Sequence, residues 1–254
     1  MRLAVERRRD HAAVLRDISL LHPFDAGHEL IRVGGEGDGG YLVPDDLSGI
    51  EACYSPGVGG SSAFELDLER RGIPSFLADG SVDSPPAGAG HLSFVRRFLG
   101  EVDDERSMTL DTWLSLRPAG AQGDLLLQMD IEGCEYGVIL STSRSVLRRF
   151  RIIVAELHRV DSLVHPLAGP LMAAAFRRLA QDFVPVHLHP NNSGRPLRIG
   201  PVTYPRLLEV TWLRRDRCRR MSPLVPGRHP LDRDNHSAKR GFELSGDWFA
   251  ASRP

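Results

Sequence analysis

Acidic and histidine side chains follow three apolar runs of this sequence. Asp130 comes after the run LLLQM, and Glu156 and His158 come after the run IIVA. His189 ends a third stretch that begins with FVPV. Residues two apart in a strand face the same side, so Glu156 pairs with His158. Carboxylates and imidazoles that meet at neighbouring strand ends can hold a cation or move a proton, and the sequence predicts such a site.

Metal binding and proton transfer divide these residues into two groups. We expect Asp130, Glu156 and His189 to surround a divalent ion, Mg²⁺ in the first instance, because oxygen ligands suit a hard cation. Imidazole is unusual on magnesium, so ligation by His189 would favour Mn²⁺ or another transition ion. His158 is the first candidate for a general base and Glu132 is the second. Two plainer interpretations stay open: a structural hydrogen bond between Glu156 and His158, and a helix-capping role for Glu132.

A glycine-rich turn precedes these segments and has the layout of a nucleoside-binding crevice. Gly57 and Gly59 let the backbone turn tightly and approach a ligand closely. A second apolar run ends at Asp79, 22 positions after Gly57, near the spacing of roughly 20 that places a carboxylate on ribose hydroxyls. Ser62 stands where a dinucleotide fingerprint has its third glycine, so that fingerprint fits only in part.

Strand-like runs alternate with helical stretches along most of the chain. Strands separated by helices indicate a parallel sheet and an α/β fold with helices on both faces. We expect an amphipathic helix near Val5–Leu21, packed against the domain or against a second copy of the chain in a homodimer, and then a glycine-rich loop through Tyr41. Strands are expected at about 51–55, 73–78, 92–95, 124–130, 151–157, 183–189 and 207–213.

Composition narrows the class of protein. A chain of 254 residues with 41% hydrophobic content can bury one α/β domain, which we expect to span 1–254, with a glycine-rich segment in 1–45 and a loop-rich tail over 222–254. The net charge of -1 gives no electrostatic footprint for nucleic acid. Three cysteines without metal spacing favour a reducing compartment, and no apolar run suits a membrane span or a signal peptide. We therefore expect a cytoplasmic protein.

Several motifs together resemble the S-adenosylmethionine-dependent methyltransferases of the FkbM type. The resemblance spans roughly 32–213 and implies a class I methyltransferase sheet, Rossmann-like and mostly parallel, whose last strand is antiparallel. It also implies S-adenosylmethionine as cofactor and a small-molecule or oligosaccharide acceptor, methylated on a hydroxyl of a sugar or glycosylated compound. The motifs are RVGGEGDGGYLVP, YSPGVGGSS, FLADGS, TLDTWL, QMDIEGCEYGVI, HLHPNNSG and LEVTWL.

The resemblance also assigns residues to the cofactor and the acceptor. The glycine turn would hold the methionine portion, Asp79 the ribose, and the DGGY segment the amino-acid end, with Arg32 available for its carboxylate. Asn191 and Asn192 are expected to contact sugar hydroxyls, although asparagines before a glycine are also turn formers. The residues expected at the cofactor are Arg32, Gly39, Tyr41, Gly57, Gly59, Ser61, Ser62, Asp79 and Asp130.

Two other functions use the same crevice. A nicotinamide-dependent oxidoreductase would bind its dinucleotide there, but the third glycine is missing and the DIEGCE segment has no evident part in hydride transfer. A cofactor-binding protein without catalytic activity is the second alternative.

Overall fold

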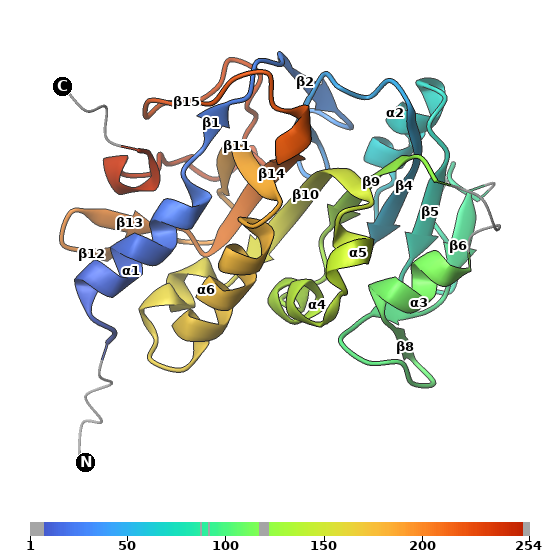
Figure 1. Ribbon diagram of the computed structural model, residues 1–254, viewed down its shortest axis with the longest axis horizontal. Helices are drawn as coiled ribbons and strands as arrows, with labels where there is room; N and C mark the ends of the chain where they lie inside the picture. Colours follow the sequence, from blue (N-terminus) through green and yellow to red (C-terminus); the bar gives the residue numbers. More distant parts are fainter. Residues whose placement is uncertain (1–7, 87, 91, 117–121, 251–254) are drawn as a thin grey trace.

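A seven-stranded sheet forms the centre of the molecule (Figure 1). The computed structural model describes all residues except 1–7, 87, 91, 117–121 and 251–254. The strands lie in the order β11-β14-β10-β9-β4-β5-β6. They are the seven strands that the sequence predicted, with ends that agree to within two residues: β4 (Ile50–Pro56), β5 (Ser75–Ala78), β6 (Ser93–Val95), β9 (Asp124–Met129), β10 (Phe150–His158), β11 (Phe183–Asn191) and β14 (Leu207–Arg214).

The direction of the strands fixes where a ligand crevice can form. β4 pairs in parallel with β5 and β9, β5 with β6, and β9 with β10. β14 lies antiparallel between β10 and β11, so the last strand of the central sheet in chain order has the orientation that the resemblance implied. From β4 the chain continues to β5 and β6 toward one edge of the sheet, and from β9 it continues to β10 on the other side. The strand order therefore reverses between β4 and β9, and in such sheets the crevice lies at the carboxyl ends of these strands.

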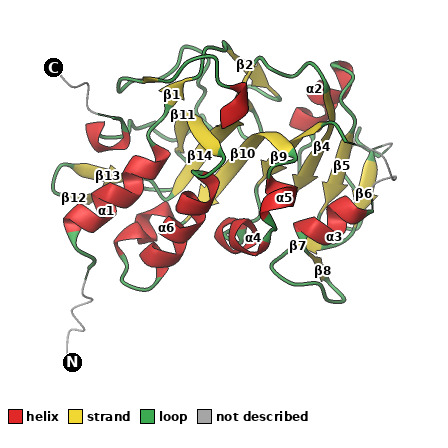
Figure 2. Ribbon diagram, viewed as in Figure 1, coloured by secondary structure: helices red, strands yellow, loops and turns green. Residues whose placement is uncertain are grey.

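Alternating side chains of the sheet enter two hydrophobic cores. In β4, Ala52 and Tyr54 belong to one core and Cys53 to the other, as the period of two requires. Helices cover the first face, and one helix with a hairpin covers the second (Figure 2). The first group is α1 (His11–Ile18), α3 (Leu110–Ser115), α4 (Glu135–Ser141), α5 (Arg144–Leu147) and α6 (Ala168–Leu179); the second is α2 (Ala63–Arg70) with β2 (Leu30–Val33) and β3 (Tyr41–Pro44).

The hairpin and three other short strand pairs were not predicted. β2 and β3 occupy the segment expected to be a glycine-rich loop, and their strands are short and joined by a glycine-rich connection over residues 34–40. The other pairs are β1 (Phe24–Asp25) with β15 (Ser222–Pro223), β7 (Phe98–Leu99) with β8 (Ser107–Met108), and β12 (Leu197–Ile199) with β13 (Val202–Tyr204). Short 3-10 turns occur at Ser19–Leu21, Val160–Val164, Arg215–Arg217 and Gly246–Trp248.

Both ends of the described chain pack onto the first core. α1 begins after Asp10, whose side chain accepts a hydrogen bond from the Ala13 backbone N–H, and it buries Val14 and Ile18. The expected helix therefore starts later than Val5, and its first residues lie outside the described part of the chain. Near the other end, Trp248 is fully buried and its indole N–H donates to the Thr203 carbonyl at 2.8 Å. No helix among the described residues is long and apolar enough to cross a membrane.

Candidate active site

A cavity of about 750 Å³ lies at the carboxyl ends of β4, β5 and β9, where the strand order reverses. Small-molecule sites commonly occupy about 300–1,000 Å³, so the cavity can hold a nucleoside cofactor. Eight of the predicted site residues line it: Gly39, Tyr41, Gly57, Gly59, Ser61, Asp79, Asp130 and Glu132.

The glycine turn brings the ends of β4 and β9 into contact. Gly57 has φ +80°, and a Cβ atom there would lie 1.6 Å from the Asp130 carbonyl oxygen. Only glycine can occupy this position without moving the backbone. The Gly59 N–H donates to Asp79 Oδ2 at 3.1 Å, and Asp79 Oδ1 accepts from the Ser81 N–H and hydroxyl. These bonds hold the Asp79 carboxylate at the cavity wall.

Arg32 and Ser62, both expected at the cofactor, are not among the described residues that line the cavity. The Arg32 guanidinium donates to the carbonyls of Gly35 at 2.8 Å and Gly37 at 3.0 Å. It therefore shapes the loop that presents Gly39 to the cavity. Ser62 is the N-cap residue of α2, and its buried hydroxyl makes no hydrogen bond with any described residue.

Asp130, Glu156 and His158 converge beside the cavity. One ligand atom from each lies within 4.8 Å of the other two, which is close enough for the three to hold one metal ion. His158 Nε2 is 3.8 Å from Asp130 Oδ1, 3.8 Å from Glu156 Oε1 and 3.4 Å from Glu132 Oε2. Parallel pairing of β9 with β10 brings these strand ends together.

The three side chains of this cluster hold their protons more tightly than the free side chains do. Burial, outweighing the nearby charge of His158, raises the pKa of Asp130 to about 7. Burial and the charges of Asp130 and Glu209 raise the pKa of Glu156 to about 9. Burial lowers the pKa of His158, but its hydrogen bond to Glu135 and the surrounding carboxylates raise it to about 9. Crowded carboxylates must share protons or bind a positive ion.

Glu135 orients His158 and had no role assigned from the sequence. Its Oε1 atom lies 3.0 Å from His158 Nδ1 and accepts hydrogen bonds from the backbone N–H groups of Ile131 and Gly133. The Glu135 side chain is fully buried. This contact turns His158 Nε2 toward the carboxylates, in the manner of the outer carboxylates that orient metal-bound histidines. Its position in the DIEGCE motif was the available signal, but the contact depends on β10.

Two strained residues follow the strand ends that form the cluster. Glu132 has φ +58° and Arg159 has φ +55°, and they are the two non-glycine residues with positive φ in the described part of the chain. Such conformations cost on the order of 1–3 kcal/mol and concentrate at functional sites. The Glu132 side chain is 88% exposed, and the N-cap position of α4 belongs to Cys134, so Glu132 does not cap that helix.

His189 lies away from Asp130 and Glu156, which corrects the metal set expected from the sequence. In the sheet Glu209 pairs with Glu156 on one side and with His189 on the other. Two strand spacings therefore separate His189 from Glu156, about 10 Å between backbones. His189 Nδ1 instead lies 3.7 Å from Asp232 Oδ1, which is also 2.9 Å from His187 Nε2. The structure puts His158 in the cluster where the sequence suggested His189.

The asparagines expected at the substrate are engaged within the protein. Asn191 donates to Glu156 Oε2 at 2.9 Å and so orients a member of the cluster. Asn192 donates to the carbonyls of His236 and Lys239 and holds the C-terminal segment over the sheet. Both are buried, and neither is among the described residues of the cavity wall. Glu209, also missed from the sequence, is buried beneath the same segment, and burial raises its pKa to about 7.

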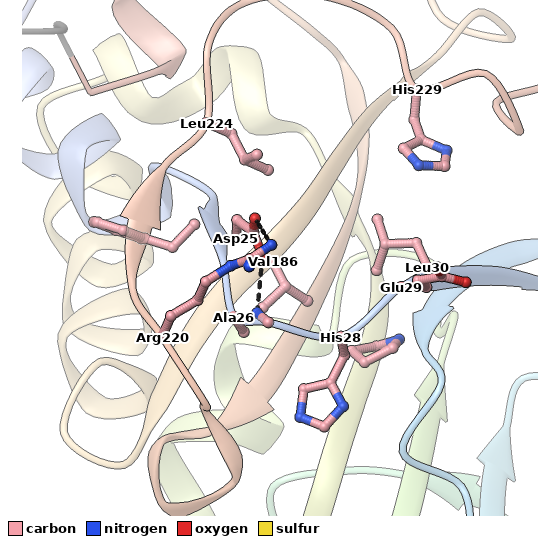
Figure 3. A pocket seen from close by; sticks show the side chains of 12 residues that line it. Asp25, Ala26, His28, Glu29, Leu30, Val186, Arg220, Leu224 and His229 are labelled. Atoms are coloured by element: carbon pink, nitrogen blue, oxygen red, sulfur yellow. Dashed lines mark hydrogen bonds and ion pairs between the residues drawn. The ribbon is translucent and has the colours of Figure 1, made fainter.

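A second cavity, of about 490 Å³, is lined by residues of β1, β2, β3 and β11 and of the loops next to them (Figure 3). An ion pair between Asp25 and Arg220 crosses its wall, with His28, Leu224 and His229 around it. It contains none of the residues that the sequence assigned to cofactor, metal or substrate. The assigned residues that do line a cavity therefore belong to the first one.

The sheet order, its antiparallel strand and the crevice between β4 and β9 define a Rossmann-like methyltransferase fold. Residues 67–177 match the family model described as Methyltransferase FkbM domain. The match includes Asp79, Asp130, Glu156 and His158. It supports a methyltransferase and bears out, over these residues, the FkbM-type resemblance predicted from the motifs. A comparison with curated proteins finds no match.

Proposed function

We propose that the protein is an S-adenosylmethionine-dependent O-methyltransferase that acts on a hydroxyl of a sugar or glycosylated small molecule with the help of a divalent cation. The observation that carries this proposal is the negative charge of the cavity and of the Asp130, Glu156 and His158 cluster beside it. Five carboxyl groups line the cavity, and none of the described lining residues is lysine, arginine or histidine. The carboxylates are those of Asp38, Glu65, Asp79, Asp130 and Glu132.

This charge distribution discriminates between cofactors. S-adenosylmethionine carries a positive sulfonium and a positive ammonium group, and both are attracted to a cavity lined with carboxylates. A nicotinamide dinucleotide carries a pyrophosphate, which would meet the same carboxylates without a basic residue to offset its charge. The cavity therefore favours the methyl donor over the dinucleotide of the alternative oxidoreductase.

The donor set beside the cavity fits a divalent cation. Asp130 and Glu156 offer carboxylate oxygens and His158 offers Nε2, while Glu135 holds the opposite ring nitrogen. An imidazole among the ligands favours Mn²⁺ over Mg²⁺. Such an ion lowers the pKa of a hydroxyl bound to it.

Methyl transfer requires that the acceptor oxygen be aligned and lose its proton. The bond from this oxygen to the methyl carbon forms as the carbon–sulfur bond breaks, and the hydroxyl proton leaves. His158 Nε2 is directed at Asp130 and Glu156, the two carboxylate ligands of the proposed cation. We therefore propose that Glu132 accepts the hydroxyl proton, because its exposed carboxylate lines the cavity 3.4 Å from that nitrogen. The roles of first and second candidate base are thus exchanged relative to the sequence prediction.

The acceptor class comes from the motifs. They resemble sugar and natural-product O-methyltransferases, including a bacterial O-methyltransferase of methylmannose polysaccharide, and a role in polysaccharide biosynthesis fits this resemblance. We propose that the acceptor is a saccharide that offers a hydroxyl, and we propose no nucleic-acid or membrane partner. We propose a cytoplasmic location because the three cysteines, which lack metal spacing, favour a reducing compartment.

Calorimetric titration with S-adenosylhomocysteine, NAD and Mn²⁺ tests the proposal. We expect S-adenosylhomocysteine and Mn²⁺ to bind and NAD to bind weakly. Glu156→Gln should abolish Mn²⁺ binding and leave S-adenosylhomocysteine binding intact, because Glu156 belongs to the cluster but does not line the cavity. Binding of NAD without S-adenosylhomocysteine would overturn the cofactor. Methyl transfer to a saccharide panel that survives chelation of all divalent ions would overturn the cation, and binding without turnover would favour the non-catalytic alternative.

A further inference from the structure

The second cavity, which contains no residue assigned to the cofactor or the cation, combines apolar walls with a few polar side chains. Its volume of about 490 Å³ lies within the roughly 300–1,000 Å³ of sites that bind small molecules. Predominantly apolar walls with a small number of polar groups are also typical of such sites. The larger apolar side chains of the wall are those of Phe24, Leu30, Pro44, Val186 and Leu224.

Hydrogen bonds hold the polar side chains of this cavity in place. The Asp25 carboxylate pairs with the Arg220 guanidinium, and Asp25 Oδ1 also accepts the Gly27 N–H at 2.8 Å (Figure 3). His229 Nδ1 accepts the Leu231 N–H at 3.2 Å, so the neutral ring carries its proton on Nε2 and can donate it. The Arg220 side chain is 63% exposed, so a ligand can reach the ion pair.

The charge of the cavity indicates an uncharged ligand that is rich in hydroxyl groups. An anion would meet two carboxylates, those of Asp25 and Glu29, and a cation would find Asp25 already paired with Arg220. A carboxylate accepts hydrogen bonds and a guanidinium donates them, while the neighbouring hydroxyls of a sugar ring can do both. The less polar face of the same ring can lie against the apolar walls. A saccharide unit therefore matches both the polar and the apolar part of the cavity.

Strand β3 extends across the sheet from the first cavity to the second. At one end Tyr41 lines the first cavity, and its hydroxyl lies 3.4 Å from Gln128 Nε2 of β9. At the other end Pro44 lines the second cavity together with Val186 of β11. The order β11-β14-β10-β9 puts three strand spacings between these ends, about 14 Å between backbones. A chain of linked sugars can span this distance, whereas a single sugar cannot.

The C-terminal segment joins the same two cavities independently of the hairpin. His229 lines the second cavity, and further along the chain Asn235 donates to Oδ1 of Asp38, a lining residue of the first cavity, at 3.3 Å. Between them Arg233 pairs with Glu36 in the connection between β2 and β3. These contacts fix the position of one cavity relative to the other. One ligand can bind at two sites at once only when their spacing suits its length.

We propose that the second cavity binds a saccharide unit of the acceptor that is remote from the methylated hydroxyl. This inference rests on the proposed function, because it concerns the acceptor of the same reaction. A sugar held by Asp25 and Arg220 raises the effective concentration of the reacting end of the acceptor at the Asp130, Glu156 and His158 cluster. The cavity thereby selects an acceptor with several sugar units over a monosaccharide.

Methyl transfer to mannose oligosaccharides of increasing length tests this inference, because the motifs resemble an O-methyltransferase of methylmannose polysaccharide. In the native protein we expect kcat/KM to rise at the length at which the acceptor reaches both cavities. Arg220→Gln should lower kcat/KM for the longer acceptors by about 10- to 150-fold, the range for a hydrogen bond to a charged group, and leave the value for the monosaccharide unchanged. The change should lie in KM, because Arg220 does not contact the reacting atoms.

Two further variants serve as controls. Arg16→Gln removes the same charge from an exposed residue of α1 that lines neither cavity, and it should leave all acceptors unaffected. Leu224→Ala removes part of the apolar wall and keeps the ion pair, and it should reproduce the loss for the longer acceptors alone. If Arg220→Gln does not fold, Leu224→Ala decides by the same comparison.

The outcomes distinguish failure of this inference from failure of the proposed function. A native kcat/KM that does not depend on acceptor length, or an Arg220→Gln protein weakened equally for every acceptor, would overturn the role of the second cavity while the transferase activity stands. If no saccharide is methylated, the proposed function is wrong, and calorimetry with a mannose hexasaccharide decides the inference. Binding that Arg220→Gln removes supports the saccharide site, and equal binding or no binding in both proteins overturns it.

Discussion

Replacement of Glu135 by glutamine tests how the cluster is positioned. Glu135 Oε1 holds His158 Nδ1 at 3.0 Å and accepts two backbone N–H groups, so its side chain cannot move without breaking contacts. Glutamine has the same shape, and its amide oxygen can still accept hydrogen bonds, but it removes the negative charge. A bond from imidazole N–H to a neutral amide is about half as strong as one to a carboxylate. His158 Nε2 then becomes a weaker ligand.

The size of the expected change in Mn²⁺ affinity follows from the position of Glu135, which contacts the proposed ligand His158 and not the cation itself. Outer partners of metal-bound histidines typically change metal affinity by about 10- to 100-fold, which is about 1.4–2.7 kcal/mol. We expect the dissociation constant for Mn²⁺ to rise by this factor in Glu135→Gln. The fully buried position of Glu135 excludes solvent from the contact and places the effect toward the upper part of the range.

Titration calorimetry with Mn²⁺ measures this change directly, and electron paramagnetic resonance of the free ion gives an independent value. Glu105→Gln is the matched control, because it removes the same charge from an exposed loop residue. Binding of S-adenosylhomocysteine should be retained in both variants. An unchanged Mn²⁺ affinity in a folded Glu135→Gln protein would refute the argument that His158 is a ligand oriented by Glu135.

Two further predictions concern the crevice and the sheet. Gly57→Ala should abolish S-adenosylhomocysteine binding and lower the melting temperature, because its Cβ would meet the Asp130 carbonyl at 1.6 Å; near-native binding would contradict the geometry, and Gly72→Ala, also at positive φ but with open space, is the control. Asp124→Asn should lower the free energy of unfolding at pH 7 by about 3 kcal/mol, since the carboxylate joins Arg151 and Arg214. Burial raises the pKa of Asp124, but hydrogen bonds from the two arginines outweigh it and hold the pKa below its usual value. This stabilisation is therefore present above about pH 4 and lost as the pH falls through the folded-state pKa. Denaturant titrations should then show that the free energy of unfolding falls less steeply below pH 4 in Asp124→Asn than in the native protein. Parallel pH dependence of the two proteins would be inconsistent with the assignment.

The sequence by itself determined the sheet and the crevice. Runs such as LLLQM and IIVA are apolar on both faces, which is typical of buried parallel strands, and all seven strands formed where these runs lie. The glycine turn and Asp79 were equally readable, because a positive φ and a close backbone approach leave a local signal at Gly57. The sequence was enough to predict the structure wherever the residues of one segment determine the conformation of that segment.

Only the tertiary structure decided which side chains meet. His158 and His189 both end apolar strands and look alike in the sequence. The antiparallel β14 lies between their strands. Glu209 of β14, and not His189, is therefore the cross-strand neighbour of Glu156. Glu135 and Glu65 each resemble an ordinary acidic residue in the first turn of a helix. Glu135 contacts His158 and Glu65 contacts Ser55 because those helices pack against particular strands, and pairing between distant segments leaves no mark in local spacing.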